Sequence, residues 1–378
     1  MEGPRACKME EFETLLELIN KTFRAQSGYK PTMAEEFPLL LNKENINNIR
    51  TILIEDKPVA AVNFYKSTIL IEGIPISAAS VGGVCTDVDN QGKGYSTILL
   101  DDAEQLMREY IVDIVLVSGD RSLYLRRGCC KAGSCFEFVI NPDKEKSQEI
   151  ELVDFKDEYL RIMAEIYNRE PTRYYRSLYE FKMLLKGATI PWGNYTYKVY
   201  LLKSRGLVHG YVVLRIIDDD PDWGYLIEFS GDREIVYRAL TDIALQNSLN
   251  YIKVKCTSND SMSYIIKREK IKYDEINLYG TMKILNFVSF MNKLMPYFRQ
   301  YVDREIADNI IFGEEGGRYM FELGDEVLKI CDDDTLVKLV FGDKSGKTLY
   351  PCNKPMIDSF ISSVFPIPFV WAGNLNFQ

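Results

Sequence analysis

The run from Gly83 to Ser96 has the residue types and spacing of a site that binds a phosphate group. An apolar strand comes first, then a polar turn with Gly92 and Gly94, and then the start of a helix. The glycines let the backbone approach an anion without a Cβ in the way, and Lys93 adds a mobile positive charge. Free amides and the positive end of the helix dipole meet at this point. The run therefore predicts a strand, a phosphate loop and a helix.

The spacing excludes two common phosphate loops and favours a third. No Gly-Lys-Ser/Thr follows a four-residue gap, as a Walker loop requires, and the third glycine of the dinucleotide fingerprint is missing. Gln91-x-x-Gly94-x-Ser96 resembles the Arg/Gln-x-x-Gly-x-Gly/Ala loop of the GNAT acetyltransferases, with Ser96 in place of glycine or alanine. The resemblance implies an acetyl-CoA site, without a metal, at Val84, Cys85, Thr86, Gln91, Gly92, Lys93, Gly94, Tyr95, Ser96, Ser118 and Gly119.

The segment Ser118–Cys129 contains a second candidate. It resembles the Tyr-x-x-x-Gly-Tyr/Phe segment after the fifth strand of many GNAT proteins, although Cys129 replaces the aromatic residue. The resemblance implies that Tyr124 protonates the departing CoA thiolate, a step that needs a proton donor in a dry site. The alternative is an ordinary half-buried tyrosine. Nearby arginines either contact CoA phosphates or form a solvated basic face; they are Arg121, Arg126 and Arg127.

The elements around these motifs are expected to form a mixed sheet with helices. Apolar residues at helical spacing predict a helix from Met9 to Phe23. Hairpins are expected around Asp56-Lys57 and Glu72-Gly73, where β-branched and aromatic residues flank the turns. A helix from Ser96 to Tyr110 and a strand from Ile111 to Val117 complete the order found in GNAT domains.

The expected fold class is α/β (α+β), with two GNAT-like mixed-sheet domains in tandem followed by a sterol-carrier-like α/β domain. We place these domains at residues 1–145, 146–284 and 285–378. The second unit repeats the order of the first, but its turn Phe229–Glu234 has one glycine and two carboxylates. Because carboxylates repel a pyrophosphate, this unit is interpreted as a degenerate domain without a cofactor site.

Periodicity predicts the remaining elements and a docked tail. Helices are expected at Leu152–Arg169, Leu178–Lys186, Asp232–Leu249, Leu285–Phe298 and Lys354–Ser363. Strands are expected at Tyr197–Lys203, Leu207–Ile217, Trp223–Phe229, Tyr251–Cys256, Arg318–Leu323, Glu326–Cys331 and Thr335–Phe341. The chain closes on the uncharged run Phe365–Trp371, and an apolar segment of this kind is expected to dock on the protein.

Composition excludes several classes of function. The net charge of −9 on 378 residues argues against a nucleic-acid partner, and no apolar run is long enough for a membrane helix. The eight cysteines form no Cys-x-x-Cys pair and indicate reduced thiols. Without an export signal, the chain is expected to be cytoplasmic. The single histidine, His209, leaves little scope for a Ser-His-Asp triad or a metal site.

In order and length the whole chain resembles the Eis family of N-acetyltransferases. Members acetylate amines, including aminoglycosides, and assemble as hexamers, which implies a homo-oligomer here. They use a tyrosine as general acid, matched by Tyr124, and the C-terminal carboxylate as general base, which would fall on Gln378. The apolar tail would carry that carboxylate into the first domain. Asn374–Gln378 also resembles a protease-tag remnant, so Asp87 and a bridging water stay open as alternative bases.

The expected function is direct acetyl transfer from acetyl-CoA to a primary amine of a small cationic substrate, such as an aminoglycoside or a polyamine. An acyl-cysteine route through Cys85 is disfavoured, because no histidine is available to activate the thiol. Two alternatives remain open. One is an acetyltransferase that acts on protein lysines or N-termini. The other is a non-catalytic protein that binds acyl-CoA and a lipid.

Overall fold

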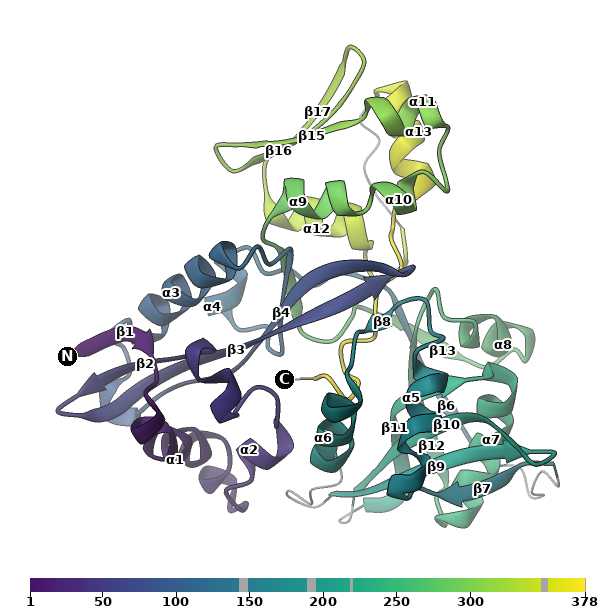
Figure 1. The fold of residues 1–378 in the computed structure, drawn as a ribbon. Coiled ribbons are helices and arrows are strands. Elements are labelled where there is room, and N and C mark those ends of the chain that lie inside the picture. The colour runs from purple at the N-terminus through teal and green to yellow at the C-terminus, as the bar shows by residue number, and fades with distance from the viewer. Residues whose placement is uncertain (143–148, 189–194, 218–219, 348–352, 378) are drawn as a thin grey trace.

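The computed structural model describes residues 1–142, 149–188, 195–217, 220–347 and 353–377. These residues form two seven-stranded sheets and one three-stranded sheet, with helices packed on them. In Figure 1 the part with the small sheet lies above the two large sheets, and the chain ends between them. The mixed α/β class expected from the sequence is confirmed.

The first large sheet has the order β1-β2-β3-β4-β5-β14, and β8 pairs with β3. Its strands are β1 (Glu2–Ala6), β2 (Ile49–Ile54), β3 (Lys57–Ile71), β4 (Ile74–Thr86), β5 (Ile114–Val117), β8 (Arg173–Tyr174) and β14 (Thr281–Ile284). Its helices are α1 (Phe12–Phe23), α2 (Met33–Glu36), α3 (Tyr95–Glu109) and α4 (Ser122–Leu125). The two expected hairpins form at the expected turns. Glu55, Asp56, Glu72 and Gly73 have positive φ there, as tight hairpin turns require.

The second large sheet has the order β13-β6-β12-β11-β10-β9-β7. Its strands are β6 (Cys135–Ile140), β7 (Glu151–Asp154), β9 (Tyr195–Ser204), β10 (Leu207–Ile217), β11 (Asp220–Gly231), β12 (Tyr251–Thr257) and β13 (Tyr273–Ile276). Its helices are α5 (Leu160–Tyr167), α6 (Leu178–Ala188), α7 (Arg233–Gln246) and α8 (Met262–Arg268). The parallel pair β11–β12, with α7 between its strands in sequence, repeats the parallel pair β4–β5 with α3.

Three strands pair with the large sheet on the other side of an expected domain boundary. β6 follows α4 in sequence but pairs with β12 and β13 in the second sheet. β8 lies between β7 and β9 in sequence and β14 follows β13, but they pair with β3 and β5 in the first sheet. The two large sheets therefore do not divide at residue 145, whereas every strand of the small sheet follows residue 284. Local sequence patterns do not reveal this exchange, because tertiary contacts decide which edge a strand joins.

The C-terminal part contains α9 (Phe287–Lys293), α10 (Met295–Phe298), α11 (Arg304–Asn309), β15 (Ile311–Glu315), β16 (Arg318–Leu323), β17 (Glu326–Ile330), α12 (Asp333–Phe341) and α13 (Pro355–Val364). Buried phenylalanines meet at steep angles in its core. The rings of Phe298 and Phe360, for example, lie 5.2 Å apart at 76°. Such edge-to-face pairs are preferred because the edge of one ring is positive and the face of the other is negative.

Two of the expected elements differ in type from the structure, and several strands, β15 among them, were not expected. Thr335–Phe341 lies in α12 and is not a strand. The Asp332 carboxylate accepts a hydrogen bond from the Thr335 amide at 2.8 Å, and this cap starts the helix. Leu152–Arg169 is not one helix but the strand β7 followed by α5. Short apolar runs fit both the helix period and the strand period, so periodicity alone did not distinguish helices from strands here.

The tail is docked, as the sequence predicts. Its buried residues are Phe365, Ile367, Phe369, Val370, Ala372, Leu375 and Asn376. Across the described parts of the chain, every helix is too short or too polar to span a lipid bilayer. The same residues bring together no group of three or more His, Cys, Asp or Glu side chains that could hold a metal ion.

Candidate functional site

A split between β4 and β5 opens the first large sheet. The two strands pair from Ala78 with Ile114 to Val81 with Val117, and β4 then continues to Thr86. A bulge bends β4 where the pairing ends, and Gly83 in this bulge has φ +60°. The side-chain amide of Asn63 donates a 3.0 Å hydrogen bond to the Gly83 carbonyl. A Cβ at Gly83 would lie 2.7 Å from that amide nitrogen. The bulge therefore needs glycine and turns the end of β4 away from its neighbour.

The loop after β4 presents unused amides at the start of α3. Gly92 (φ +77°) and Gly94 (φ +81°) are left-handed, and a Cβ on either would meet only open space. Gly94 is the N-cap of α3 and supplies no capping side chain. Within the described residues, hydrogen-bond acceptors are lacking for the amides of Gly92, Lys93, Gly94, Tyr95 and Ser96. These residues fit a pyrophosphate, because unsatisfied amides and the helix dipole point to one place.

Side-chain contacts tie the strand end to this loop. The hydroxyls of Thr86 and Ser96 lie 2.8 Å apart, which joins β4 to the first turn of α3. Lys93 donates to the Asn90 side chain at 2.8 Å and is otherwise exposed. The strand end and the loop predicted from the sequence therefore lie together in the structure.

Tyr124 lies in α4, beside the end of β5. Its ring packs against Gly119, where an added Cβ would lie 3.2 Å from Cε2. It shares one hydrophobic cluster with Val84 and Val117, which flank the strand split. Burial raises the pKa of Tyr124 above the ordinary value of about 10. The hydroxyl therefore stays protonated at neutral pH.

Cys85 points to the opposite face of β4. Its side chain packs in the cluster of Phe12 and Leu15 from α1, whereas the neighbouring Val84 packs in the cluster of Tyr124. Burial raises the pKa of the Cys85 thiol to about 12. A neutral thiol on the far face of the sheet is a poor nucleophile, which agrees with the low weight given to an acyl-cysteine route.

Two other charged candidates have partners elsewhere. The Lys21 ammonium contacts Asp87 at 2.9 Å and, through this hydrogen bond, lowers the pKa of that carboxyl. A more acidic carboxyl is a weaker base, so Asp87 is a weaker candidate for the general base. Arg127 donates to Asp101 at 2.7 Å and to the carbonyl of Thr97, so it braces α3.

The described end of the tail reaches the first sheet near Ser118. Phe377 and Asn376 line a small cavity of about 20 Å³ together with Val117 and Ser118. The Phe377 ring meets the ring of Tyr279 edge-on, with 5.1 Å between centroids. Gln378, the expected carrier of the base, lies outside the described residues.

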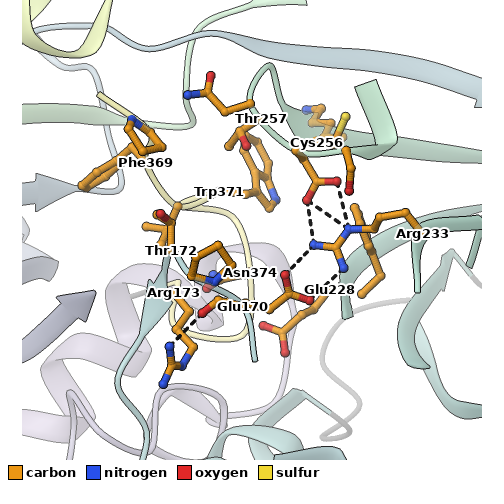
Figure 2. Close-up of a pocket in the computed structure, with 18 of the residues that line it drawn as sticks. Glu170, Thr172, Arg173, Glu228, Arg233, Cys256, Thr257, Phe369, Trp371 and Asn374 are labelled. Carbon is orange, nitrogen blue, oxygen red and sulfur yellow. Dashed lines mark hydrogen bonds and ion pairs between the residues drawn. The ribbon is translucent and has the colours of Figure 1, made fainter. Parts of the chain in front are cut away.

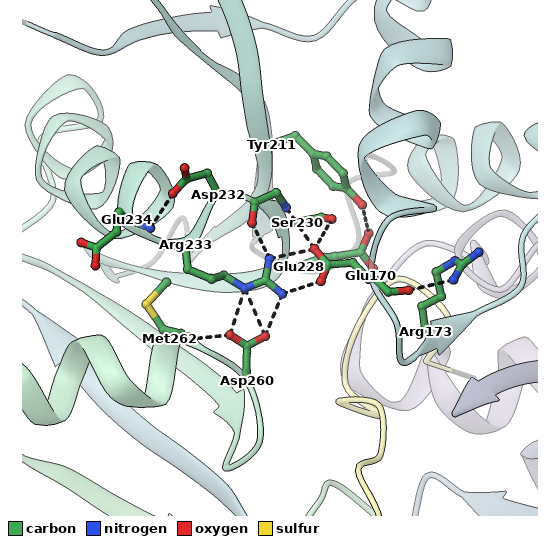
Figure 3. Close-up of polar contacts among 11 residues, drawn as sticks. Glu170, Arg173, Tyr211, Glu228, Ser230, Asp232, Arg233, Glu234, Asp260 and Met262 are labelled. Carbon is green, nitrogen blue, oxygen red and sulfur yellow. Dashed lines mark hydrogen bonds and ion pairs between the residues drawn. The ribbon is translucent and has the colours of Figure 1, made fainter. Parts of the chain in front are cut away.

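The corresponding turn of the second unit is closed by its own side chains. The Asp232 carboxylate caps α7 and accepts hydrogen bonds from the amides of Glu234 and Ile235 at 2.9 and 3.2 Å. Arg233 lies between two carboxylates, 2.8 Å from Glu170 and 2.8 Å from Asp260 (Figure 3). The Asp232 carboxylate therefore takes two amides that a phosphate would need, and the lack of a cofactor site in this unit stays a prediction.

Sequence reasoning missed a buried ion pair, Arg176–Glu228, that contacts the tail. Its partners are 52 residues apart, and the tail residue that contacts Glu228, Leu375, is a further 147 residues along the chain. Glu228 lies in β11, and Arg176 lies between β8 and α6. No local motif marks such a pair, so only the fold could reveal it.

The comparisons with known proteins agree with this geometry. Residues 4–132 match the family model of the Acetyltransferase (GNAT) domain. No curated protein matches the chain in sequence. Three solved structures share its fold. One is a GCN5-related N-acetyltransferase from Anabaena variabilis, with a TM-score of 0.64 and 14% identity over 94% of this chain and 95% of that chain. Another GCN5-related N-acetyltransferase, from Kribbella flavida, has a TM-score of 0.62 and 13% identity over 99% of this chain and 97% of that chain. Eis1 from Mycobacterium abscessus has a TM-score of 0.61 and 14% identity over 96% of each chain.

The family match covers the strand split, the loop and Tyr124, and the structural matches cover nearly the whole chain. Residues 4–132 thus match a GNAT acetyltransferase domain, and the chain has the overall fold of Eis-like GNAT proteins.

Proposed function

We propose that the chain transfers acetyl from acetyl-CoA directly to a primary amine of a small cationic substrate. The observation that carries this proposal is the grouping of three features at one split in the sheet. These are the free end of β4, the uncapped start of α3 and the protonated hydroxyl of Tyr124. Together they provide an anion cradle, a strand edge and a proton donor, which acyl transfer from a thioester requires.

Each part of the site has a distinct role in this proposal. The amides of Gly92–Ser96 hold the pyrophosphate of the donor. The backbone of Val84 and Thr86 aligns the thioester by strand-like hydrogen bonds. Tyr124 gives its proton to the leaving sulfur, and the chain-end carboxylate of Gln378 takes the proton from the attacking amine. Much of the rate comes from holding both reactants in attack geometry.

The substrate class and the assembly belong to the same proposal. A net charge of −9 favours a cationic acceptor over an anionic one. From the resemblance to Eis proteins, we also propose a cytoplasmic homo-hexamer with a sterol-carrier-like domain at the C-terminus. Light scattering on the intact chain tests the hexamer.

Release of free CoA thiol from acetyl-CoA tests the activity. The assay uses small amines, polyamines and aminoglycosides as acceptors, with the intact protein, Tyr124→Phe and a variant extended beyond Gln378. We expect Tyr124→Phe to lower kcat by about 100-fold, because a general acid contributes that much or more. Its affinity for acetyl-CoA, measured by calorimetry, should not change.

The extended variant isolates the base. A sharp loss of kcat in that variant supports the chain-end carboxylate, whereas full activity excludes it and leaves the acid role intact. Acetyl-CoA binding without turnover on any small amine would contradict the proposed substrate class. Turnover on lysine peptides in the same assay would then identify a protein acceptor.

A further inference from the structure

Arg176 and Glu228 form a deeply buried ion pair, and both residues contact the tail. The side chains are 1% and 5% exposed. Two hydrogen bonds of 2.9 and 2.7 Å join guanidinium to carboxylate, and Tyr211 donates a third to Glu228 at 2.7 Å. The guanidinium also lies 4.1 Å from the centre of the Tyr167 ring. Apolar residues often stabilise a core as well as a buried ion pair does, so this pair invites a role other than stability.

Both members of the pair use their remaining hydrogen-bonding capacity on the tail. Arg176 Nε donates to the Asn376 side-chain oxygen at 2.6 Å. Glu228 accepts from the amide of Leu375 at 3.4 Å. The tail is also folded on itself at this point, because Asn374 accepts from the amides of Asn376 and Phe377 at 2.8 and 2.9 Å. The pair therefore fixes a short, pre-shaped turn of the tail.

The tail lies along the second unit where that unit repeats the strand split of the first. β11 and β12 pair from Trp223 to Tyr225, and β11 then continues alone on that side. A cavity of about 270 Å³ follows (Figure 2). Its walls come from β11 at Ile227–Phe229, from β12 at Lys255–Thr257, and from the tail at Pro368–Trp371 and Asn374. The tail thus occupies one side of the notch that corresponds to the candidate donor site of the first unit.

The two ends of this contact lie on different units. Leu375 and Asn376 are held by the second unit through Arg176 and Glu228. Asn376 and the next residue, Phe377, also line the small cavity at Val117 and Ser118 of the first unit. Asn376, which is held by the second unit, therefore lies beside the candidate site of the first unit.

We propose that the second unit serves as a receptor for the chain's own C-terminal tail, with Arg176 and Glu228 as positioning residues that fix Leu375 and Asn376 beside Ser118. The docking stands on the contacts alone. Its effect on catalysis rests on the proposed function, in which the chain-end carboxylate acts as base.

Removal of C-terminal residues by a carboxypeptidase, followed by intact mass spectrometry of the full chain, tests the docking. We expect Glu228→Gln and Asn376→Ala to lose residues about tenfold faster than the wild type or more, because cleavage follows local release of the tail. Asn376→Ala changes only the tail side of the contact, so it tests the idea even where a buried change prevents folding.

Glu36→Gln is the matched control. Glu36 forms a similar pair with Arg24, with hydrogen bonds of 2.9 and 2.5 Å and side-chain exposures of 4% and 9%, but it does not contact the tail. It should leave the cleavage rate unchanged. Equal rates in Glu228→Gln, Asn376→Ala and the wild type would overturn the proposal, as would equal acceleration in Glu36→Gln.

Kinetics separate positioning from the proposed catalytic chemistry. If the tail carries the base, Glu228→Gln should lower kcat by about tenfold without changing KM for acetyl-CoA. Combining it with Asn376→Ala should add little, because both act through one contact. Faster cleavage with unchanged kcat would support the docking while removing the chain-end base from the proposed function.

Discussion

The starts of α3 and α7 occupy equivalent places in two units of the same architecture, yet their chemistry is opposite. At α3 the N-cap is Gly94, and the first amides have no acceptor among the described residues. At α7 the N-cap is Asp232, whose carboxylate takes two of those amides itself. The two helix starts thus differ first in the residue at the N-cap position.

The following residue completes the difference. After Gly94, Tyr95 begins the helix without an ion pair, whereas after Asp232 the guanidinium of Arg233 is held by Glu170 and Asp260 (Figure 3). A fold can therefore keep its strands and helices while one of its two notches changes from binding a ligand to binding its own side chains. The fold alone does not determine which unit is active.

The largest effect is expected when the first turn is given the cap of the second. Gly94→Asp adds a carboxylate at the start of α3, where a Cβ has open space around it. We expect affinity for acetyl-CoA to fall by about 100-fold, because the new charge repels the phosphates and competes for the amides. Calorimetry of acetyl-CoA binding measures this change.

Gly94→Asn is its neutral control. Asparagine has the same shape and tolerates the left-handed backbone equally well. An equal loss of affinity in both variants would mean that bulk, and not charge, separates the two turns.

A smaller effect, on stability, is expected in the second turn. Arg233→Met leaves the partly buried carboxylates of Glu170 and Asp260 without their shared partner. We expect the free energy of unfolding to fall by about 3 kcal/mol, the order found when one partner of a buried pair is removed. Urea denaturation measures this change, and acetyl-CoA affinity should remain that of the wild type.

Arg268→Met removes an exposed pair with Glu234 and serves as the comparison. Exposed pairs contribute little, so this variant should unfold at nearly the wild-type urea concentration. Comparable destabilisation by the two variants would show that the Arg233 contacts are no more than a surface network.

The smallest effect is expected from removing the second cap alone. Asp232→Ala should lower the free energy of unfolding by about 1 kcal/mol, as is usual for the loss of an N-cap side chain. Thermal melting measures it, with Asp332→Ala at the cap of α12 as the matched change in another helix. Measurable acetyl-CoA binding at the second unit of Asp232→Ala would contradict the comparison, because the carboxylates of Glu170 and Asp260 still lie beside the helix start.

The sequence predicted the two turns well because their determinants are local. The left-handed glycines at 92 and 94 shape the first turn, and the carboxylate at 232 accepts from neighbouring amides in the second. The hairpin turns at Asp56 and Gly73 were found for the same reason. The roles of Tyr124 and Gln378 stay predictions, since the fold places Tyr124 beside the split but does not test its chemistry.

The misses share a different cause, which is distance along the chain. β8 and β14 join a sheet to which the strands before and after them in sequence do not belong. Arg176 meets Asn376 across 200 residues, and no local pattern encodes that contact. Thr335–Phe341 was wrongly predicted as a strand because its apolar residues also fit strand spacing, although Asp332 before it is a typical helix-start residue.

The exchanged strands also set an order of events during synthesis. A ribosome releases β5 well before β14, because Val117 precedes Thr281 in the chain. Until β14 arrives, the outer edge of β5 exposes N–H and C=O groups that can pair with any other strand. The nascent protein is therefore a natural client for chaperones that shield strand edges, and chains interrupted between these two strands should be prone to aggregate.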